Sequence, residues 1–300
     1  MNLLNQIIVK TMPLIPKPII KKVAMKYIAG HGLKDAINES KKLMRIGAWT
    51  TIDVLGEFVE TKEMAIEATE ESSRVIEAIN DHNLQSYLSI KPTSQGLGID
   101  FDFAYKNIKK LVAKALSKNI WVRLDMENSP YTDLTLDMYR KLRADGFDNV
   151  GIVLQAYMRR SEDDVRSLME LKPSVRLCKG IYRESPEIAY QGKEEIRDNY
   201  KKLLNMIIEN DMYIGIATHD EPLIRYAEDY LHKNNIEKNK YEFQMLLGVR
   251  EQKRDEIIKN GHPMRIYVPY GEDWYGYSTR RLKENPNMAG HVFKAMFSSK

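Results

Sequence analysis

Polar and ionisable side chains stand within or just after eight short apolar segments of this 300-residue chain. A set that combines lysines, carboxylates, amides, a histidine and a tyrosine could bind an anion, form a Schiff base or move a proton. One such residue is ordinary for a loop or a helix cap, but one on nearly every segment predicts a single polar site. The residues are Asp53, Glu57, Lys91, Asp125, Gln155, Arg176, Lys179, Thr218, His219, Gln244 and Tyr267.

The residue types limit the chemistry of this site. Metal hydrolysis needs clustered histidine and carboxylate ligands. Of six histidines only His219 follows an apolar segment, so we expect no metal. With Cys178 as the single cysteine, the chain forms no intramolecular disulfide. A Schiff-base lyase or aldolase stays open as an alternative, because Lys91 and Lys179 both stand where a reactive lysine would.

A pair of adjacent arginines, Arg280 and Arg281, follows the eighth segment. Tyr277, Arg281 and Glu284 are spaced by four and three residues, which places them on one face of a predicted helix. Two guanidinium groups offer parallel N–H donors that match the two oxygens of a carboxylate. If this helix lies over the site, the pair would clamp a carboxylate ligand beside Tyr267 and Tyr277.

For the polar residues to form one site, the fold must bring the ends of the eight apolar segments together. The segments are rich in β-branched residues, and Glu/Lys-rich stretches with apolar residues every three or four positions lie between them. The pattern predicts an α/β fold, a closed (β/α)₈ barrel of TIM type, with its active site at the carboxyl ends of the strands. An open doubly wound sheet is disfavoured, because Leu55-Gly56-Glu57 after the first strand lacks a Gly-rich dinucleotide turn. The expected strands are 49–54, 86–90, 120–124, 150–154, 174–178, 213–217, 241–245 and 264–268, and the expected helices are 62–80, 104–118, 135–145, 162–171, 193–209 and 222–233.

An N-terminal helical arm, residues 1–45, precedes the predicted barrel domain, residues 46–300, whose C-terminal helix would lie over the barrel mouth. The net charge is +4, but residues 1–48 hold nine Lys/Arg against two Asp/Glu, so the arm is basic. Residues 1–26 combine apolar clusters with five lysines, which suits either a membrane-surface segment or packing onto the barrel. No stretch has the length and apolar character of a membrane span. The body lacks a basic stripe with interleaved aromatics, so nucleic acid is not an expected partner.

Short motifs on nearly every expected strand resemble those of the proline dehydrogenases. The last segment reads RIYVPYG followed by YSTRRLKEN, which is similar to the C-terminal signature of that family. The earlier blocks SIKPT, RLDME, LQAY, VRLCKGIY, ATHD and FQML follow in the family's order. The resemblance covers residues 45–290.

The resemblance implies an FAD enzyme with a distorted (β/α)₈ TIM-type barrel. Such an enzyme oxidises L-proline to Δ1-pyrroline-5-carboxylate by hydride transfer to the flavin N5 and passes the electrons to a membrane quinone. The resemblance further implies a cytoplasmic enzyme with peripheral contact at the inner face of the membrane. A chain of 300 residues lacks room for the aldehyde dehydrogenase and DNA-binding modules of bifunctional relatives. We therefore expect a separate pyrroline-5-carboxylate dehydrogenase to act on the product, in the first step of proline catabolism.

The resemblance also implies roles for individual residues. Arg280 and Arg281 would hold the proline carboxylate with Lys91 as a further cation, and Glu284 would orient the arginine pair. The ring would be packed by Leu246, Tyr267 and Tyr277, with Asp125 beside Lys91. The residues expected to contact the flavin are Met126, Gln155, Arg176, Cys178, Lys179, Gly180, Lys193, Ala217, Thr218, His219 and Gln244. One departure is Asp220, where many relatives have Asn.

Overall fold

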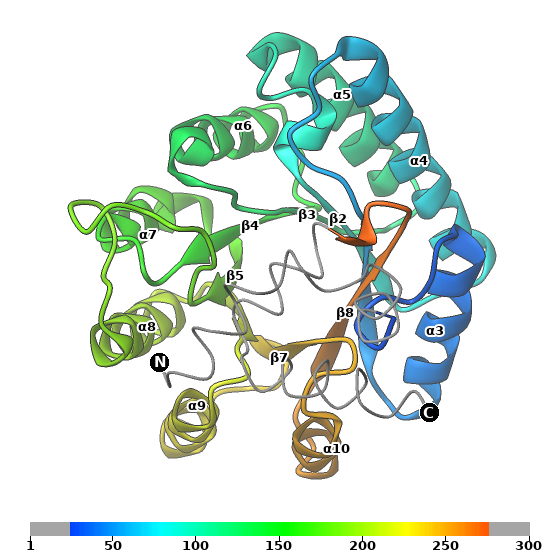
Figure 1. The fold of residues 1–300 in the computed structure, drawn as a ribbon. Coiled ribbons are helices and arrows are strands. Elements are labelled where there is room, and N and C mark those ends of the chain that lie inside the picture. Colours follow the sequence, from blue (N-terminus) through cyan, green and yellow to red (C-terminus); the bar gives the residue numbers. More distant parts are fainter. Residues whose placement is uncertain (1–24, 276–300) are drawn as a thin grey trace, which may run out of the picture.

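The computed structural model describes residues 25–275, and these form a closed barrel of eight parallel strands in the order β1 to β8 (Figure 1). Each strand pairs with the next along the chain, and β8 closes the barrel on β1. This confirms the predicted barrel. The strands are β1 Trp49–Val54, β2 Ser86–Ile90, β3 Val122–Leu124, β4 Val150–Gln155, β5 Ser174–Cys178, β6 Tyr213–Ala217, β7 Tyr241–Leu246 and β8 Met264–Tyr270.

Helices form the outer ring around the strands (Figure 1). The first of them, α3, lies within the expected N-terminal arm and packs against β1 and β8. The helices are α3 Leu33–Arg45, α4 Lys62–Asp81, α5 Phe101–Leu116, α6 Thr132–Ala144, α7 Ser161–Leu168, α8 Lys193–Glu209, α9 Glu221–Lys233 and α10 Glu251–Lys259, and short 3₁₀ turns are η2 Pro92–Gln95, η3 Ser129–Tyr131 and η4 Met169–Leu171.

Capping side chains determine where two of the helices begin. The Thr61 hydroxyl accepts a hydrogen bond from the Met64 N–H before α4, and Asp100 accepts one from the Phe103 N–H before α5. Each bond satisfies a donor that the first helical turn leaves unpaired. The cap at Asp100 starts α5 at Phe101, three residues before the expected start.

The interior of the barrel is unusually polar. Alternate residues of each strand point inward, and hydrogen bonds between strands that are not neighbours cross the interior. Arg176 on β5 reaches Asp125 after β3 and Gln244 on β7, and Tyr267 on β8 also reaches Asp125. Barrel interiors are more often filled by Val, Ile and Leu. The sequence has therefore placed charged side chains where packing alone would choose apolar ones.

No helix within residues 25–275 is long and apolar enough to cross a membrane. Nearly all of the basic N-terminal segment 1–26 lies outside the described residues, as does the expected C-terminal helix over the barrel mouth.

Candidate active site at the barrel mouth

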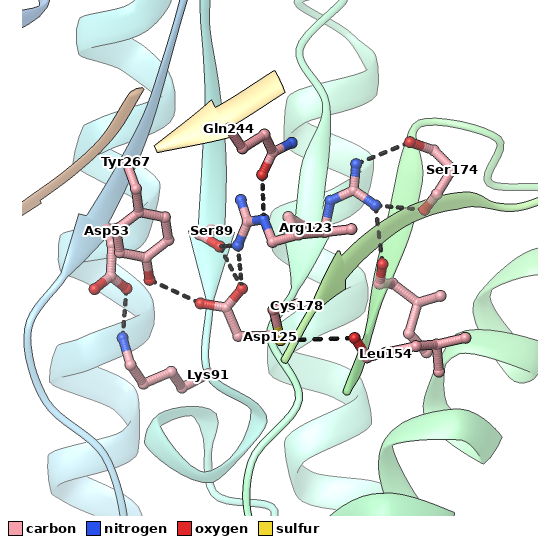
Figure 2. Close-up of polar contacts among 12 residues, drawn as sticks. Asp53, Ser89, Lys91, Arg123, Asp125, Leu154, Ser174, Cys178, Gln244 and Tyr267 are labelled. Carbon is pink, nitrogen blue, oxygen red and sulfur yellow. Dashed lines mark hydrogen bonds and ion pairs between the residues drawn. The ribbon is translucent and has the colours of Figure 1, made fainter. Parts of the chain in front are cut away.

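Asp125 is the centre of a hydrogen-bond network that joins four strands at the barrel mouth (Figure 2). Its Oδ1 accepts hydrogen bonds from the Ser89 hydroxyl at 2.8 Å and from Nη1 of Arg176 at 2.7 Å. Its Oδ2 accepts one from the Tyr267 hydroxyl at 2.8 Å. Because its two oxygens accept these hydrogen bonds, Asp125 orients Arg176 and Tyr267.

Tyr267 presents its ring at the same place. The guanidinium carbon of Arg176 lies 5.1 Å from the ring centroid, within range of a cation–π contact. Burial and the negative charge of Asp125 raise the pKa of Tyr267 well above its ordinary value. The phenol therefore stays protonated, and its hydroxyl donates to Asp125.

Lys91 and Asp53 form a buried ion pair beside this network, with Nζ 2.6 Å from Oδ1 (Figure 2). The lysine residue is 8% exposed and the aspartate 1%. Burial alone would lower the pKa of Lys91, but the charges of Asp53 and Asp125 raise it instead. The lysine is an ammonium at neutral pH, so it can bind a carboxylate. It lacks the lone pair that Schiff-base chemistry needs.

Glu127 is a buried carboxylate just behind the mouth, after β3. It accepts hydrogen bonds from the backbone N–H and the hydroxyl of Thr93. The backbone carbonyl of Glu127 accepts a hydrogen bond from Gln155 Nε2 at 2.9 Å. This bond fixes the Gln155 amide at the end of β4. Met126, between Asp125 and Glu127, is buried as well. Burial raises the pKa of Glu127 to about 7, although the bonds from Thr93 oppose the shift.

The pKa of Glu127 predicts a pH dependence of stability. An acid whose folded pKa lies above its ordinary 4.5 contributes stability that is complete below about pH 4.5 and lost as the pH rises through about 7. The loss expected is about 3 kcal/mol of unfolding free energy. Urea unfolding of the wild type and of Glu127→Gln between pH 5 and pH 8 measures it. The wild type should lose stability over this range more steeply than the variant, and equal slopes would contradict the assignment.

The loop after β5 places a cation and a tight turn at the rim. Gly180 has φ +106°, and a Cβ there would overlap the ring of Tyr157. Lys179 lies 3.1 Å from Asp220, and Cys178, at the strand end, donates to the Leu154 carbonyl. Gly180 is thus required both by its backbone angle and by the closeness of the ring.

Asp220 holds two cations at this rim. Arg197 on α8 reaches it with Nε at 3.0 Å and Nη2 at 2.6 Å, in addition to Lys179. Burial would raise the pKa of Asp220, but Arg197 and Lys179 lower it to about 2, so the carboxyl is ionised. On the same helix, Lys193 is the residue for which the family resemblance implies a contact with the flavin, and that role stays a prediction. Lys193 is exposed at the first position of α8, and Arg197, one turn further along the same face, is the residue that reaches Asp220.

The ends of β6 and β7 lie against each other. His219 accepts a hydrogen bond at Nε2 from the Leu246 N–H at 2.9 Å, and the Thr218 hydroxyl accepts one from the Asp220 N–H at 3.1 Å. Ala217 and Leu246 are the last residues of their strands and are both partly buried. These four residues share one part of the rim, as the sequence predicted.

Four of the predicted site residues lie outside the described range: Tyr277, Arg280, Arg281 and Glu284. Of the residues that the structure does describe, no three His, Cys, Asp or Glu side chains are grouped so that they could hold a metal ion.

The sequence profile of proline dehydrogenase matches residues 36–294. The chain belongs to the proline dehydrogenase family. The match includes every strand and helix of the barrel from β1 to β8. It also includes the segment with the arginine pair.

Individual proline dehydrogenases are similar to this chain along almost their whole length. Proline dehydrogenase 2 of Bacillus subtilis (strain 168) is 41% identical over 273 residues, which is 91% of this chain and 90% of the relative. Proline dehydrogenase of Deinococcus radiodurans is 35% identical over 278 residues, again 91% and 90%.

A solved structure shows the same fold. The crystal structure of proline utilization A from Bdellovibrio bacteriovorus, inactivated by N-propargylglycine, matches with a TM-score of 0.82 and 26% identity. The match covers 88% of this chain and 33% of that longer chain. The similarity therefore concerns one part of a larger protein.

Proposed function

We propose that this member of the family is an FAD-dependent enzyme that oxidises L-proline to Δ1-pyrroline-5-carboxylate, with a membrane quinone as the electron acceptor. Family membership supports the reaction class. The observation that carries the proposal further is the Asp125 network, which fixes a guanidinium, a phenol ring and, beside them, a lysine ammonium at one barrel mouth.

The residues at the mouth fit a flavin by the chemistry of their donors. The polar edge of a flavin alternates carbonyl oxygens with ring nitrogens, and amides, hydroxyls and guanidinium groups complement such an edge. Gln155, Arg176, Thr218 and Gln244 supply these groups from β4 to β7. Nη2 of Arg176 makes no hydrogen bond within residues 25–275, so it is available to a ligand. Lys179 is placed for a phosphate, with Arg197 nearby on Asp220.

When bound, the flavin would supply the redox chemistry by accepting a hydride from the carbon next to the proline nitrogen. The protein positions the substrate for this step. Lys91 binds the carboxylate as a point charge, together with the arginine pair that the sequence places after β8. The ring of Tyr267 gives proline a flat surface to pack on. Holding the substrate at both its carboxylate and its ring contributes to catalysis through proximity and orientation.

The protonation state of the proline nitrogen is controlled by charge. Oxidation requires the neutral amine, because its lone pair stabilises the developing iminium. Lys91 and the two arginines place positive charge near the substrate, which lowers the pKa of its ammonium. The proton then leaves to solvent.

The alternative, a Schiff-base lyase on a barrel lysine, is not favoured. Lys91 is held as an ammonium by Asp53, and Lys179 is paired with Asp220. The visible absorbance of the purified protein tests the two functions. A flavin spectrum that bleaches on anaerobic addition of L-proline supports the dehydrogenase. A colourless protein that is trapped by borohydride with a carbonyl substrate would support the lyase.

The arginine pair gives a prediction for substrate affinity. Arg281→Met should raise the KM for proline strongly, because a bound carboxylate loses a charge-assisted partner at a cost of about 2–5 kcal/mol. The flavin should stay bound, because the residues proposed to hold it come from other strands. Steady-state kinetics and the flavin absorbance of the purified variant measure both. A variant that loses flavin but keeps the wild-type KM would contradict the carboxylate role.

We also propose that the basic N-terminal segment brings the barrel mouth to the membrane. Residues 1–26 carry five lysines and no acidic residue, and each lysine near an anionic surface contributes about 1 kcal/mol. Full-length protein should therefore sediment with anionic vesicles in a salt-sensitive way, whereas protein lacking residues 1–26 should not. If the full-length chain does not bind vesicles and the deletion aggregates, the segment packs on the barrel instead.

A further inference from the structure

A second polar layer lies inside the barrel, below the Asp125 network. Glu242 on β7 and Arg265 on β8 form an ion pair there, with Nε of the arginine 2.8 Å from Oε1 of the glutamate. Glu242 is 0% exposed and Arg265 is 3% exposed, so neither charge reaches solvent. Glu242 Oε1 also accepts a hydrogen bond from Gln244 Nε2 at 2.6 Å. The pair is thus linked directly to a predicted flavin-binding residue.

The Gln244 amide continues this link to the mouth. Its Oε1 accepts a hydrogen bond from Nε of Arg176 at 2.7 Å, and Arg176 in turn reaches Asp125 (Figure 2). The chain of contacts is therefore Arg265, Glu242, Gln244, Arg176, Asp125. It runs through the barrel interior to the site.

The direction of the amide in this chain is determined by its two neighbours. Burial alone would raise the pKa of Glu242, but Arg265 and the amide hydrogen bond hold it below its ordinary value. An ionised carboxylate only accepts hydrogen bonds, and a guanidinium only donates them. Gln244 must therefore turn its NH₂ to Glu242 and its oxygen to Arg176. Reversing the amide would set two donors against each other and two acceptors against each other.

The surrounding residues keep this arrangement in place. A Cβ at Gly215 on β6 would overlap the amide nitrogen of Gln244, so the glycine provides the space that the side chain occupies. Arg265 donates from Nη1 to the Thr50 carbonyl at 2.8 Å, and its guanidinium carbon lies 3.4 Å from the Tyr87 ring centroid. Arg265, at the inner end of this chain of contacts, is therefore held by stacking and by one hydrogen bond to backbone.

A buried ion pair contributes little net stability compared with apolar residues of the same size. Its presence inside a barrel that could be filled with aliphatic side chains calls for another role. The directional contact with Gln244 supplies one.

We propose that Glu242, supported by Arg265, is a positioning residue of the enzyme: through the Gln244 amide it fixes the Arg176 guanidinium between Gln244 and Asp125 at the barrel mouth. Its consequence for catalysis rests on the proposed function, because Arg176 is taken to contact the flavin. The hydrogen bonds from Glu242 through Gln244 to Arg176 are made by the protein itself, without a flavin.

The test removes the ion pair as a unit, so that neither Glu242 nor Arg265 is left buried without the other. The variant is Glu242→Leu combined with Arg265→Met, purified with its flavin. Arg123→Met is the matched control. Arg123 is also a buried arginine of the barrel interior, 1% exposed, but it bonds to the Ile152 carbonyl and to Ser174 instead of to Gln244. Glu242→Gln is the conservative variant, since its amide oxygen can still accept from Gln244.

For the double variant we expect a fall in kcat of about tenfold or more with flavin still bound, and a shift in the visible flavin spectrum. Glu242→Gln should recover most of both. Arg123→Met should leave the spectrum unchanged and alter kcat by less than about threefold, whatever it does to thermal unfolding. A double variant with wild-type kcat and spectrum would overturn the proposal, as would an Arg123→Met variant with the same losses.

A measurement without flavin separates this proposal from the proposed function. Hydrogen exchange at Nε of Arg176, followed by ¹⁵N NMR, reports the bond to Gln244 in the protein itself. The exchange should be at least about tenfold faster in the double variant than in the wild type or in Arg123→Met. If the wild type holds no flavin, the proposed function fails while this difference persists. If the exchange rates are equal, the positioning role fails although the enzyme is active.

Discussion

Replacing Asp125 with alanine is expected to lower kcat/KM for proline by about 10²–10³-fold, equivalent to about 3–4 kcal/mol. The carboxylate accepts hydrogen bonds from Ser89, Arg176 and Tyr267 at once, so its loss releases two groups that define the site. Arg176 would also be left as a buried cation without its carboxylate partner. Steady-state kinetics on flavin-loaded protein measure the effect.

Asp125→Asn keeps one of the two acceptor oxygens and replaces the other by an amide nitrogen. The asparagine oxygen can still accept from Arg176 and Ser89, but its amide nitrogen cannot accept from the Tyr267 hydroxyl. A variant as impaired as Asp125→Ala would show that the negative charge and the Tyr267 contact, which both variants lose, matter more than the oxygen that accepts from Arg176 and Ser89. Asp148→Ala is the control, because Asp148 pairs with Arg143 on an exposed surface, with 84% of its side chain accessible. Equal losses in Asp148→Ala and Asp125→Ala would refute the role of the network.

The strands were predictable from sequence because short β-branched runs have clear boundaries, and β1, β2, β5 and β6 have the expected ends. The differences arise from tertiary hydrogen bonds. Ile120 closes the end of α5 by donating its N–H to the Ala115 carbonyl, so β3 begins later than its apolar run. β8 continues through Pro269, because the Pro269 carbonyl accepts from Ala29 and the Tyr270 carbonyl accepts from Leu55. Such distant donors leave no local signal.

Active sites of such barrels lie at the carboxyl ends of the strands, and this rule predicted which residues stand at the mouth. It did not predict how these residues pair with one another. Lys91 and Asp53 are 38 positions apart, and Arg197 and Asp220 are 23 apart. Nothing in the local sequence links them. Arg197 shows the limit, because Lys193 stands on the same helical face and only the folded geometry decides that Arg197 reaches the Asp220 carboxylate.

The polar interior of the barrel can be recognised in the sequence, although attention to the strand ends alone misses it. Side chains two positions apart on a strand point to the same side. Glu242 precedes Gln244 by two, and Arg265 precedes Tyr267 by two. A polar residue two positions before a strand-end site residue therefore predicts a supporting contact inside the barrel.

The Lys91–Asp53 pair should give the largest change in stability. Lys91→Met leaves Asp53, 1% exposed, without its counter-charge, and breaking a buried pair in this way costs about 3–5 kcal/mol. Urea unfolding measures the loss. Replacing both residues, as Asp53→Leu with Lys91→Met, removes the uncompensated charge and should recover most of the stability, because a buried pair is close to neutral against apolar residues of similar size.

Catalysis should not recover with stability in the double variant. Its KM for proline should stay raised by about tenfold, since the ammonium that binds the carboxylate is absent whether or not Asp53 is present. The two measurements thus separate what the lysine does for the fold from what it does for the substrate. A stable double variant with the wild-type KM would show that Lys91 serves only to neutralise Asp53, and the carboxylate would then be bound by the arginine pair alone.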